Sequence, residues 1–124
     1  MPDAPASSSS SASGGVRVHR IGAVTVLAPA GALAGDAAGA FARTLSEQAD
    51  RSLGRLVVDL SAVPTLDSLA LETLVDAAHR LEDGGVALRL CGLSGTLNTV
   101  LEITGHADAF ELFPGPEEAA RSFL

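Results

Sequence analysis

Residues 55–74, RLVVDLSAVPTLDSLALETL, contain an apolar run that stops at Pro64 and resumes with helical spacing just after Asp67 and Ser68. The first part is short, rich in Leu and Val, and bounded by turn formers, which is typical of a strand buried on both faces. Asp67 and Ser68 suit a helix start, because the unpaired N–H groups and positive dipole there favour a side-chain oxygen, a carboxylate or a phosphate. The stretch therefore predicts a strand, a loop and a helix, with the helix start as the first candidate site.

Upstream of this stretch, residues 16–19 and 23–30 predict two strands that pair as a hairpin. Residues 37–50 then predict a helix, for which Asp36 is a plausible N-cap. Apolar residues at a spacing of four give this helix one buried stripe, formed by Phe41, Leu45 and Ala49.

Downstream, the central helix should continue to Asp83 and end at the glycine pair that follows it. Its outer face places Asp76 and Arg80 at the spacing of an ion pair. The remaining segments alternate again, with strands at 86–90 and 110–113 and helices at 94–105, where Ser94 is a possible cap, and 117–123. This order implies an α/β fold, a mixed central sheet with about four helices.

The ends of the chain differ in composition. Residues 1–15 are mostly Ser, Ala, Gly and Pro, so we expect a disordered N-terminal tail before one domain of residues 16–124. Residues are 47% hydrophobic but only 3% aromatic, which predicts an aliphatic core. The single cysteine, Cys91, lies in an apolar run and is expected to be a buried thiol in a reducing, cytoplasmic setting.

Charge and composition exclude several function classes. A net charge of −7 without any basic cluster argues against nucleic acid as a partner. The uncharged run 21–35 is too short to span a bilayer and contains Gly and Pro, so no direct membrane insertion is expected. His19, His79 and His106 lack metal-ligand spacing, and the chain has no phosphate-binding loop and no lysine. We therefore expect no metal and no cofactor.

Ser68 is the residue with the most open interpretation. As a nucleophile it would need a base, and no histidine is placed for that role, so an enzyme is not expected. Composition alone favours Ser68 as a helix cap, and modification by phosphate is a compatible alternative. A phosphate of charge about −1.5 to −2 beside Asp67 would change the local field while leaving the fold intact.

Several segments together resemble the STAS domain of the anti-sigma factor antagonist family, a group of bacterial regulators. The similar segments are VTVLAPAGAL, LVVDLSAVPTLDS, GGVALRLCGLS, VLEITG and FELF. The resemblance covers residues 16–124 and implies the STAS fold. It also implies that Ser68 is the phosphoacceptor, with Asp67 as its neighbour.

The family resemblance further implies a partner-switching regulator without enzymatic activity. The expected partners are an anti-sigma factor with GHKL-type serine kinase activity, which uses ATP, and a serine phosphatase that resets the switch. The implied partner-binding face includes three segments, contributed by Gly31, Leu33 and Asp36, by Asp67, Ser68, Leu69 and Ala70, and by Gly92, Leu93 and Ser94. For Asp36 and Ser94 a plain capping role is the alternative.

The sequence departs from the family pattern after Ser68. The family usually has a residue of any type, then Gly and Leu, whereas this chain has Leu69, Ala70 and Leu71. Alanine favours the helix by up to about 1 kcal/mol, and its methyl group could obstruct close approach of a kinase loop. Leu69 would add an apolar contact if exposed. These features motivate the alternative of a STAS subunit that does not switch, in a larger assembly such as a lipid-transport ATPase or a signalling scaffold.

Overall fold

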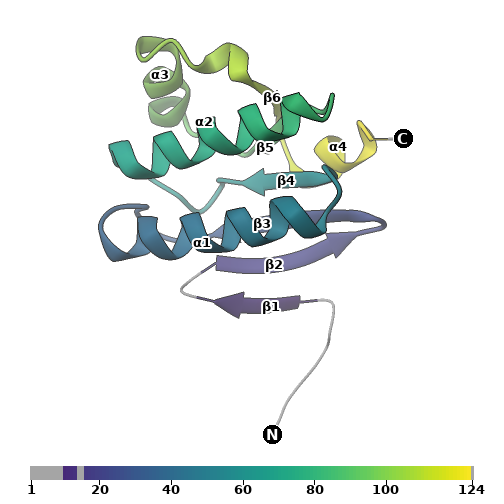
Figure 1. Ribbon diagram of the computed structural model, residues 1–124. Helices are drawn as coiled ribbons and strands as arrows, with labels where there is room; N and C mark the ends of the chain where they lie inside the picture. Colours follow the sequence, from purple (N-terminus) through teal and green to yellow (C-terminus); the bar gives the residue numbers. More distant parts are fainter. Residues whose placement is uncertain (1–9, 14–15, 124) are drawn as a thin grey trace, which may run out of the picture.

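The computed structural model describes residues 10–13 and 16–123, which form a six-stranded sheet flanked by helices (Figure 1). The strands are β1 (Ser10–Ser13), β2 (Val16–Ile21), β3 (Val24–Pro29), β4 (Leu56–Asp59), β5 (Leu88–Cys91) and β6 (Phe110–Phe113). The helices are α1 (Asp36–Arg51), α2 (Ser68–Asp83), α3 (Gly95–Ile103) and α4 (Pro116–Arg121), with a 3-10 turn, η1 (Ala107–Ala109), before β6.

The sheet is mixed, as the sequence predicted. The strands lie in the order β1-β2-β3-β4-β5-β6. The pairs β1–β2 and β2–β3 are antiparallel, and every pair from β3 to β6 is parallel. The predicted hairpin is the β2–β3 pair, in which Ile21 faces Val24 across a two-residue turn. Each parallel crossover runs through a helix, which explains the regular alternation in the sequence.

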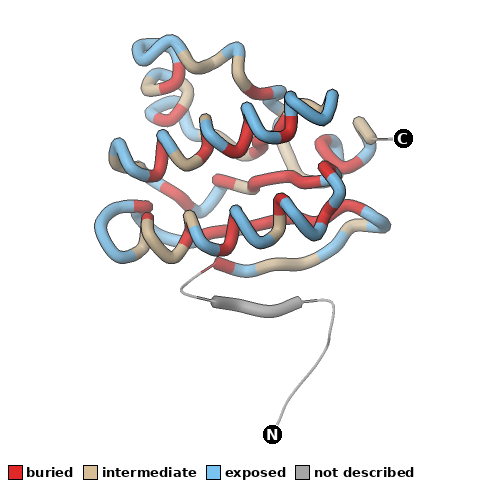
Figure 2. The backbone as a smooth tube through the Cα atoms, viewed as in Figure 1, coloured by how far each residue is buried: buried red, intermediate tan, exposed pale blue. Residues whose placement is uncertain are grey.

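The two faces of the sheet carry separate hydrophobic clusters. In β4, Leu56 and Val58 join the larger cluster beneath α1 and α2, whereas Val57 joins a smaller cluster with Ala119 and Ala120 of α4. Successive strand residues point to opposite faces, so α4 covers the face opposite to α1 and α2. These three apolar residues of β4 are fully buried, which confirms the prediction of a strand enclosed on both faces. Figure 2 shows the buried side of each long helix turned toward the sheet.

The outer contact between α1 and α2 differs from the prediction. Arg80 does not pair with Asp76 on its own helix; it forms an ion pair with Asp50 of α1 and donates a hydrogen bond to Ser46. Helix α1 offers Arg80 two acceptors, whereas its own helix would offer only Asp76, and the long arginine side chain can reach across to α1. The arrangement links the two helices across their exposed faces.

One short strand lies within the segment expected to be an N-terminal tail. Ser10–Ser13 form β1, which pairs antiparallel with β2. An edge strand such as β2 presents unpaired backbone groups, and these can bond an extended segment whatever its side chains are. Residues 1–9 and 14–15 of the expected tail lie outside the described residues.

The structure confirms that Cys91 is buried. Burial raises the pKa of its thiol to about 12, and the negative charge of Asp59 acts in the same direction. Across the described part of the chain, no helix is long and apolar enough to cross a membrane.

Candidate functional site

Three loops meet at one edge of the sheet. They are the β3–α1 loop (30–35), the β4–α2 loop (60–67) and the β5–α3 loop (92–94). Because β3, β4 and β5 are parallel, their carboxyl ends and the loops that follow share the same edge. The helices α1 and α2 both begin there, at the left of Figure 1. The three segments of the predicted partner-binding face are therefore brought together by the topology.

Asp67 is the N-cap of α2 and also binds the neighbouring loop. Its Oδ1 accepts a hydrogen bond from the backbone N–H of Ala70 at 2.9 Å, and its Oδ2 accepts one from the N–H of Gly35 at 3.0 Å. These backbone donors, Ala70 first and Gly35 second, lower the pKa of the carboxyl group. One carboxylate thus stabilises the start of α2 and joins it to the loop that leads into α1.

The prediction that Asp36 caps α1 is wrong. Helix α1 begins at Asp36 itself, and the cap position is held by Gly35 at φ 59° and ψ −127°. Glycine reaches this backbone conformation without steric strain, and its N–H is directed to Asp67. Asp36 is exposed in the first turn, where its negative charge is favourable to the helix dipole.

The prediction that Ser68 caps the helix is also wrong, because Asp67 already fills that position. Ser68 is the first residue of α2 and is exposed. Among the described residues, the Ser68 hydroxyl group has no hydrogen-bond partner. This part of the fold therefore does not use the hydroxyl, and Ser68 is exposed at the positive end of a helix.

The neighbours of Ser68 fall into exposed and buried groups. Leu69 is 48% exposed, so it offers the apolar contact considered from the sequence. Leu33 and Ala70 are 1% and 0% exposed and pack in the main core cluster. Apolar packing takes both side chains inward, so only the backbone of these two residues is left to face a partner. The Ala70 methyl group likewise does not obstruct the surface.

Backbone hydrogen bonds fix the β3–α1 loop to the β4–α2 loop. Gly31 N–H donates to the carbonyl of Ala62 at 2.9 Å, and Leu33 N–H donates to that of Thr65 at 3.0 Å. The N–H of Asp67 returns a bond to the carbonyl of Leu33 at 2.8 Å. Together with the bridge between Leu33 and Leu66, these bonds make a short parallel extension of the sheet.

The β5–α3 loop packs against the other side of the β4–α2 loop. Gly92 has φ +73°, and a Cβ atom at this position would lie 2.8 Å from the Cβ of Ser61. Ser94 is the N-cap of α3, since its hydroxyl accepts a bond from Leu97 N–H at 3.2 Å, which confirms its capping role. Leu93 is half-buried, whereas Ser94 is exposed. In the described chain, no three His, Cys, Asp or Glu side chains are grouped as metal ligands.

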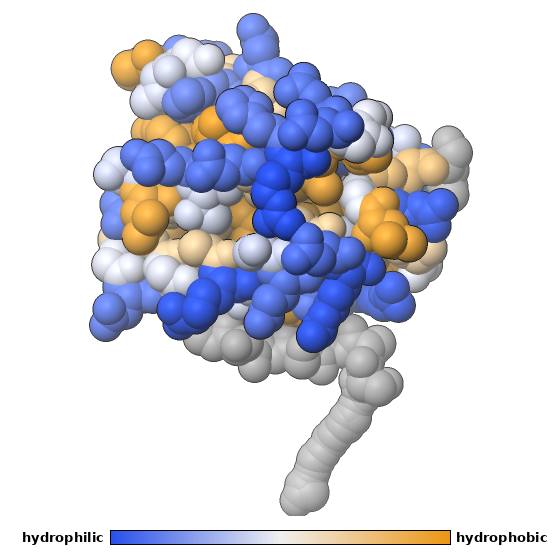
Figure 3. Space-filling model, in the orientation of Figure 1, coloured by the Kyte–Doolittle hydropathy of each residue, from blue (hydrophilic) through white to orange (hydrophobic). Residues whose placement is uncertain are grey.

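The surface around the site is mainly polar. Figure 3 shows a largely hydrophilic face over α1 and α2, with smaller hydrophobic areas, one of them at the left side where the loops of the site lie. Sequence reasoning did not identify Gly35 or Ser61 as parts of this edge. Both act through contacts to residues distant in sequence. Of the two, only Gly35 was detectable from the sequence, because a glycine just before a helix indicates a turn.

Comparison with known proteins confirms the predicted fold. The model of the STAS domain family matches residues 16–119. An anti-sigma factor antagonist from Mycobacterium paratuberculosis is 22% identical, with a TM-score of 0.75 over 86% of this chain and 91% of that chain. A STAS domain protein from Planctomyces limnophilus, also described as an anti-sigma factor antagonist, is 23% identical, with a TM-score of 0.74 over 86% and 96% of the two chains.

A third solved structure is the anti-sigma factor antagonist SpoIIAA of Bacillus in its unphosphorylated form. It is 14% identical, with a TM-score of 0.68 over 87% of this chain and 96% of that chain. No curated protein matches the sequence. At these identities the likeness to solved structures concerns the fold.

Proposed function

The chain belongs to the STAS domain family, and from this premise we propose that it is an anti-sigma factor antagonist whose partner binding is switched by phosphorylation of Ser68. The observation that carries the proposal is the free hydroxyl of Ser68. It is exposed at the first residue of α2, while Asp67 performs the capping that a serine would otherwise perform. A phosphate can therefore be added without loss of a hydrogen bond that the fold requires.

The unmodified face suits a protein partner. Leu69 offers exposed apolar area directly beside Ser68, and burial of such area contributes about 25 cal/mol per Å². The loops on both sides of Ser68 are fixed by hydrogen bonds and close packing, so little conformational entropy is lost on binding. On the loops at the same edge of the sheet, Gly31, Asp36 and Ser94 are exposed and Leu93 is half-buried, so they would extend the binding face.

Phosphorylation would reverse these properties. The kinase transfers the γ-phosphoryl group of ATP to the Ser68 oxygen, and ADP leaves. The phosphate brings a charge of about −1.5 to −2 next to Asp67, and Asp36 begins the adjacent helix. A partner that covers Leu69 would have to desolvate this charge, so its affinity should fall. A serine phosphatase that hydrolyses the phosphate restores the binding form.

The proposed partner is an anti-sigma factor that is itself a GHKL-type serine kinase. Its capture by the unphosphorylated chain would release a sigma factor. Support comes from the fold shared with anti-sigma factor antagonists. One of these relatives, SpoIIAA, has been solved in a phosphorylated as well as an unphosphorylated form.

A pull-down from the native host tests the proposal. Ser68→Ala and Ser68→Asp chains serve as baits, and Ser46→Asp is the matched control because it adds the same charge on the outer face of α1. We expect the Ser68→Ala and Ser46→Asp baits to capture a GHKL-type kinase, and the Ser68→Asp bait to lose it. The captured kinase with ATP should then add one phosphate to the wild-type chain and none to Ser68→Ala, as measured by mass spectrometry.

The exposed Leu69 also favours the second candidate, a permanent STAS subunit of a larger assembly. In that case all three baits would capture the same ATPase or scaffold component with equal yield. Leu69→Asp would then abolish capture while Ser68→Asp would not. This pattern would overturn the switching proposal.

A further inference from the structure

We propose that a pocket at the opposite edge of the sheet binds a linear carboxylate of the medium-chain fatty acid type. The pocket has a volume of about 310 Å³ and lies between the β2–β3 hairpin and α4. Its position is set by the start of β3 and by Arg55, which precedes β4, so it is found at the amino ends of the parallel strands. The Ser68 site is at their carboxyl ends, and the inference is independent of the proposed function.

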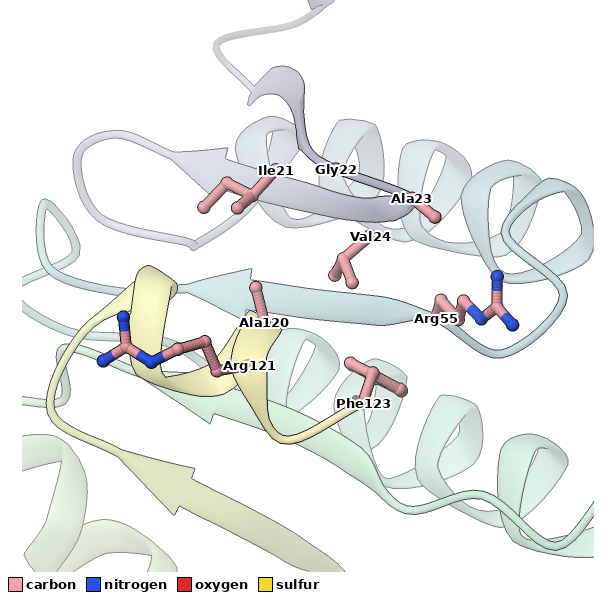
Figure 4. Close-up of a pocket in the computed structure, with 8 residues that line it drawn as sticks. All are labelled: Ile21, Gly22, Ala23, Val24, Arg55, Ala120, Arg121 and Phe123. Carbon is pink, nitrogen blue, oxygen red and sulfur yellow. The ribbon is translucent and has the colours of Figure 1, made fainter.

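The middle of the pocket is apolar. Figure 4 shows Val24 and Ala120 in the centre of the group, with Ile21 and Phe123 on either side. These side chains belong to the smaller hydrophobic cluster or pack against it, on the face of the sheet that α4 covers. A hollow with an apolar floor and a few polar groups at its margin is the usual form of a small-molecule site, and the volume is at the lower end of the common range.

The wall formed by Phe123 is held in place from behind. The guanidinium carbon of Arg89 lies 3.8 Å from the centroid of the Phe123 ring. Arg89 is itself fixed, because it donates hydrogen bonds to the hydroxyl of Ser122 at 3.0 Å and to the carbonyl of Ala87 at 2.6 Å. The ring therefore needs no reordering when a ligand enters, which lowers the entropic cost of binding.

Arg55 and Arg121 supply the charge. Both are exposed and line the pocket, and Figure 4 shows them at opposite ends of the apolar group. Among the described residues, neither forms an ion pair with a carboxylate, whereas Arg80 and Arg89 do. In a chain with net charge −7, each of these arginines offers a local site for an anion at one end of the apolar hollow.

The two features together specify the ligand chemistry. The apolar centre fits an alkyl chain, and an arginine at its end donates charge-assisted hydrogen bonds to a carboxylate. A polyanion such as a nucleotide would leave the apolar centre without a partner, and an alkyl cation would be repelled by both arginines. A medium-chain fatty acid satisfies both the apolar centre and the charged margin.

The test uses the full chain and octanoate, followed by amide NMR and calorimetry, with octan-1-ol as the uncharged probe of the same length. We expect saturable shifts at the amides of Gly22, Val24 and Phe123, and tighter binding of octanoate than of octan-1-ol. The double variant Arg55→Gln/Arg121→Gln should weaken octanoate binding about tenfold while leaving octan-1-ol binding unchanged. Arg43→Gln on the outer face of α1 is the matched control and should bind octanoate like the wild type.

Three results would overturn the proposal. They are the absence of saturable octanoate shifts, shifts centred on Ser68 and Leu69 in place of the hairpin, and equal octanoate affinity in the double variant and the wild type. Thermal unfolding of each variant verifies that the fold is retained. Since the pocket and the Ser68 face are probed by different amides, failure of one proposal leaves the other unaffected.

Discussion

The loops on the two sides of the β4–α2 loop are fixed to it by different means. The β3–α1 loop is held by directional hydrogen bonds, from Gly31 to Ala62 and from Gly35 to the Asp67 carboxylate. The β5–α3 loop is held by close packing, in which Gly92 lies against Ser61 and the Asp59 carboxylate. Both contain glycines with positive φ, but only Gly92 has no room for a side chain. The same residue type therefore has a conformational role in one loop and a steric role in the other.

Among the substitutions that test this difference between the loops, Gly92→Ala should lower the free energy of unfolding most. The new Cβ would meet the Cβ of Ser61 at 2.8 Å, the Oδ1 of Asp59 at 3.0 Å and the N of Ser61 at 3.0 Å, in addition to the strain of φ +73°. Overpacking and left-handed strain together predict a loss of roughly 2–4 kcal/mol in the free energy of unfolding. Urea unfolding of the variant and the wild type measures the difference. A loss below that of Gly31→Ala would show that packing does not fix this loop.

Gly31→Ala is the matched substitution in the β3–α1 loop. Gly31 has φ +84°, but a Cβ there would meet nothing within 4 Å, and the N–H that binds Ala62 is retained. Only the left-handed strain remains, so we expect a loss of roughly 1–2 kcal/mol in the same unfolding assay. A loss as large as that of Gly92→Ala would contradict the distinction between the two loops.

Asp67→Asn tests the hydrogen bonds that hold the β3–α1 loop, through the pH dependence of the protein's stability. The amide oxygen can still accept from Ala70, but the amide nitrogen then faces the N–H of Gly35, and two donors cannot bond. The pKa of Asp67 is lowered in the folded chain, so its carboxylate adds stability above the ordinary value of 3.8, and this stability is lost as pH falls through the folded value. The advantage of the wild type over Asp67→Asn should therefore be full at pH 7 and shrink below about pH 4.

Thermal unfolding between pH 7 and pH 3 measures this effect. Asp36→Asn is the control, because it removes a carboxylate from the start of α1 for which the described residues supply no hydrogen bond. Its difference from the wild type should change less over the same range. A constant gap between wild type and Asp67→Asn down to pH 3 would show that the carboxylate does not join the two loops.

The contrast between the loops also explains which features were predictable from sequence. The β2–β3 hairpin, the buried strand β4 and the long helix α2 follow from local patterns of apolar and turn-forming residues. The capping role of Ser94 is equally local, because its acceptor and donor lie three residues apart. For these elements one segment determines the outcome, and the sequence predicted them correctly.

The features that were missed depend on contacts between distant segments. Asp67 and Gly35 are 32 residues apart, and their bond holds Gly35 at the cap position of α1 that was predicted for Asp36. The cap of α2 is the exception, because Asp67 replaces Ser68 through a local bond to Ala70 N–H. Arg80 and Asp50 are 30 residues apart, and their ion pair replaces the predicted local pair with Asp76. The strand formed by Ser10–Ser13 pairs with β2, whose residues follow it in the chain. Local propensity contains no information about such partners.

The alkylation rate of Cys91 is expected to change least among these measurements. It reports directly on the β5–α3 loop, which is held by close packing. The thiol is buried, its pKa is raised to about 12, and it immediately precedes Gly92 at the end of β5. At pH 8 it is therefore protonated as well as inaccessible, and the folded wild type should not react with iodoacetamide over the period in which the urea-unfolded chain reacts completely.

Gly31→Ala should behave like the wild type, because it perturbs the other loop. Gly92→Ala should label measurably faster, since strain at the strand end opens the segment that covers the sulfur. Mass spectrometry of the alkylated protein follows all three chains, and equal labelling of the two glycine variants would mean that the packed and hydrogen-bonded loops loosen together.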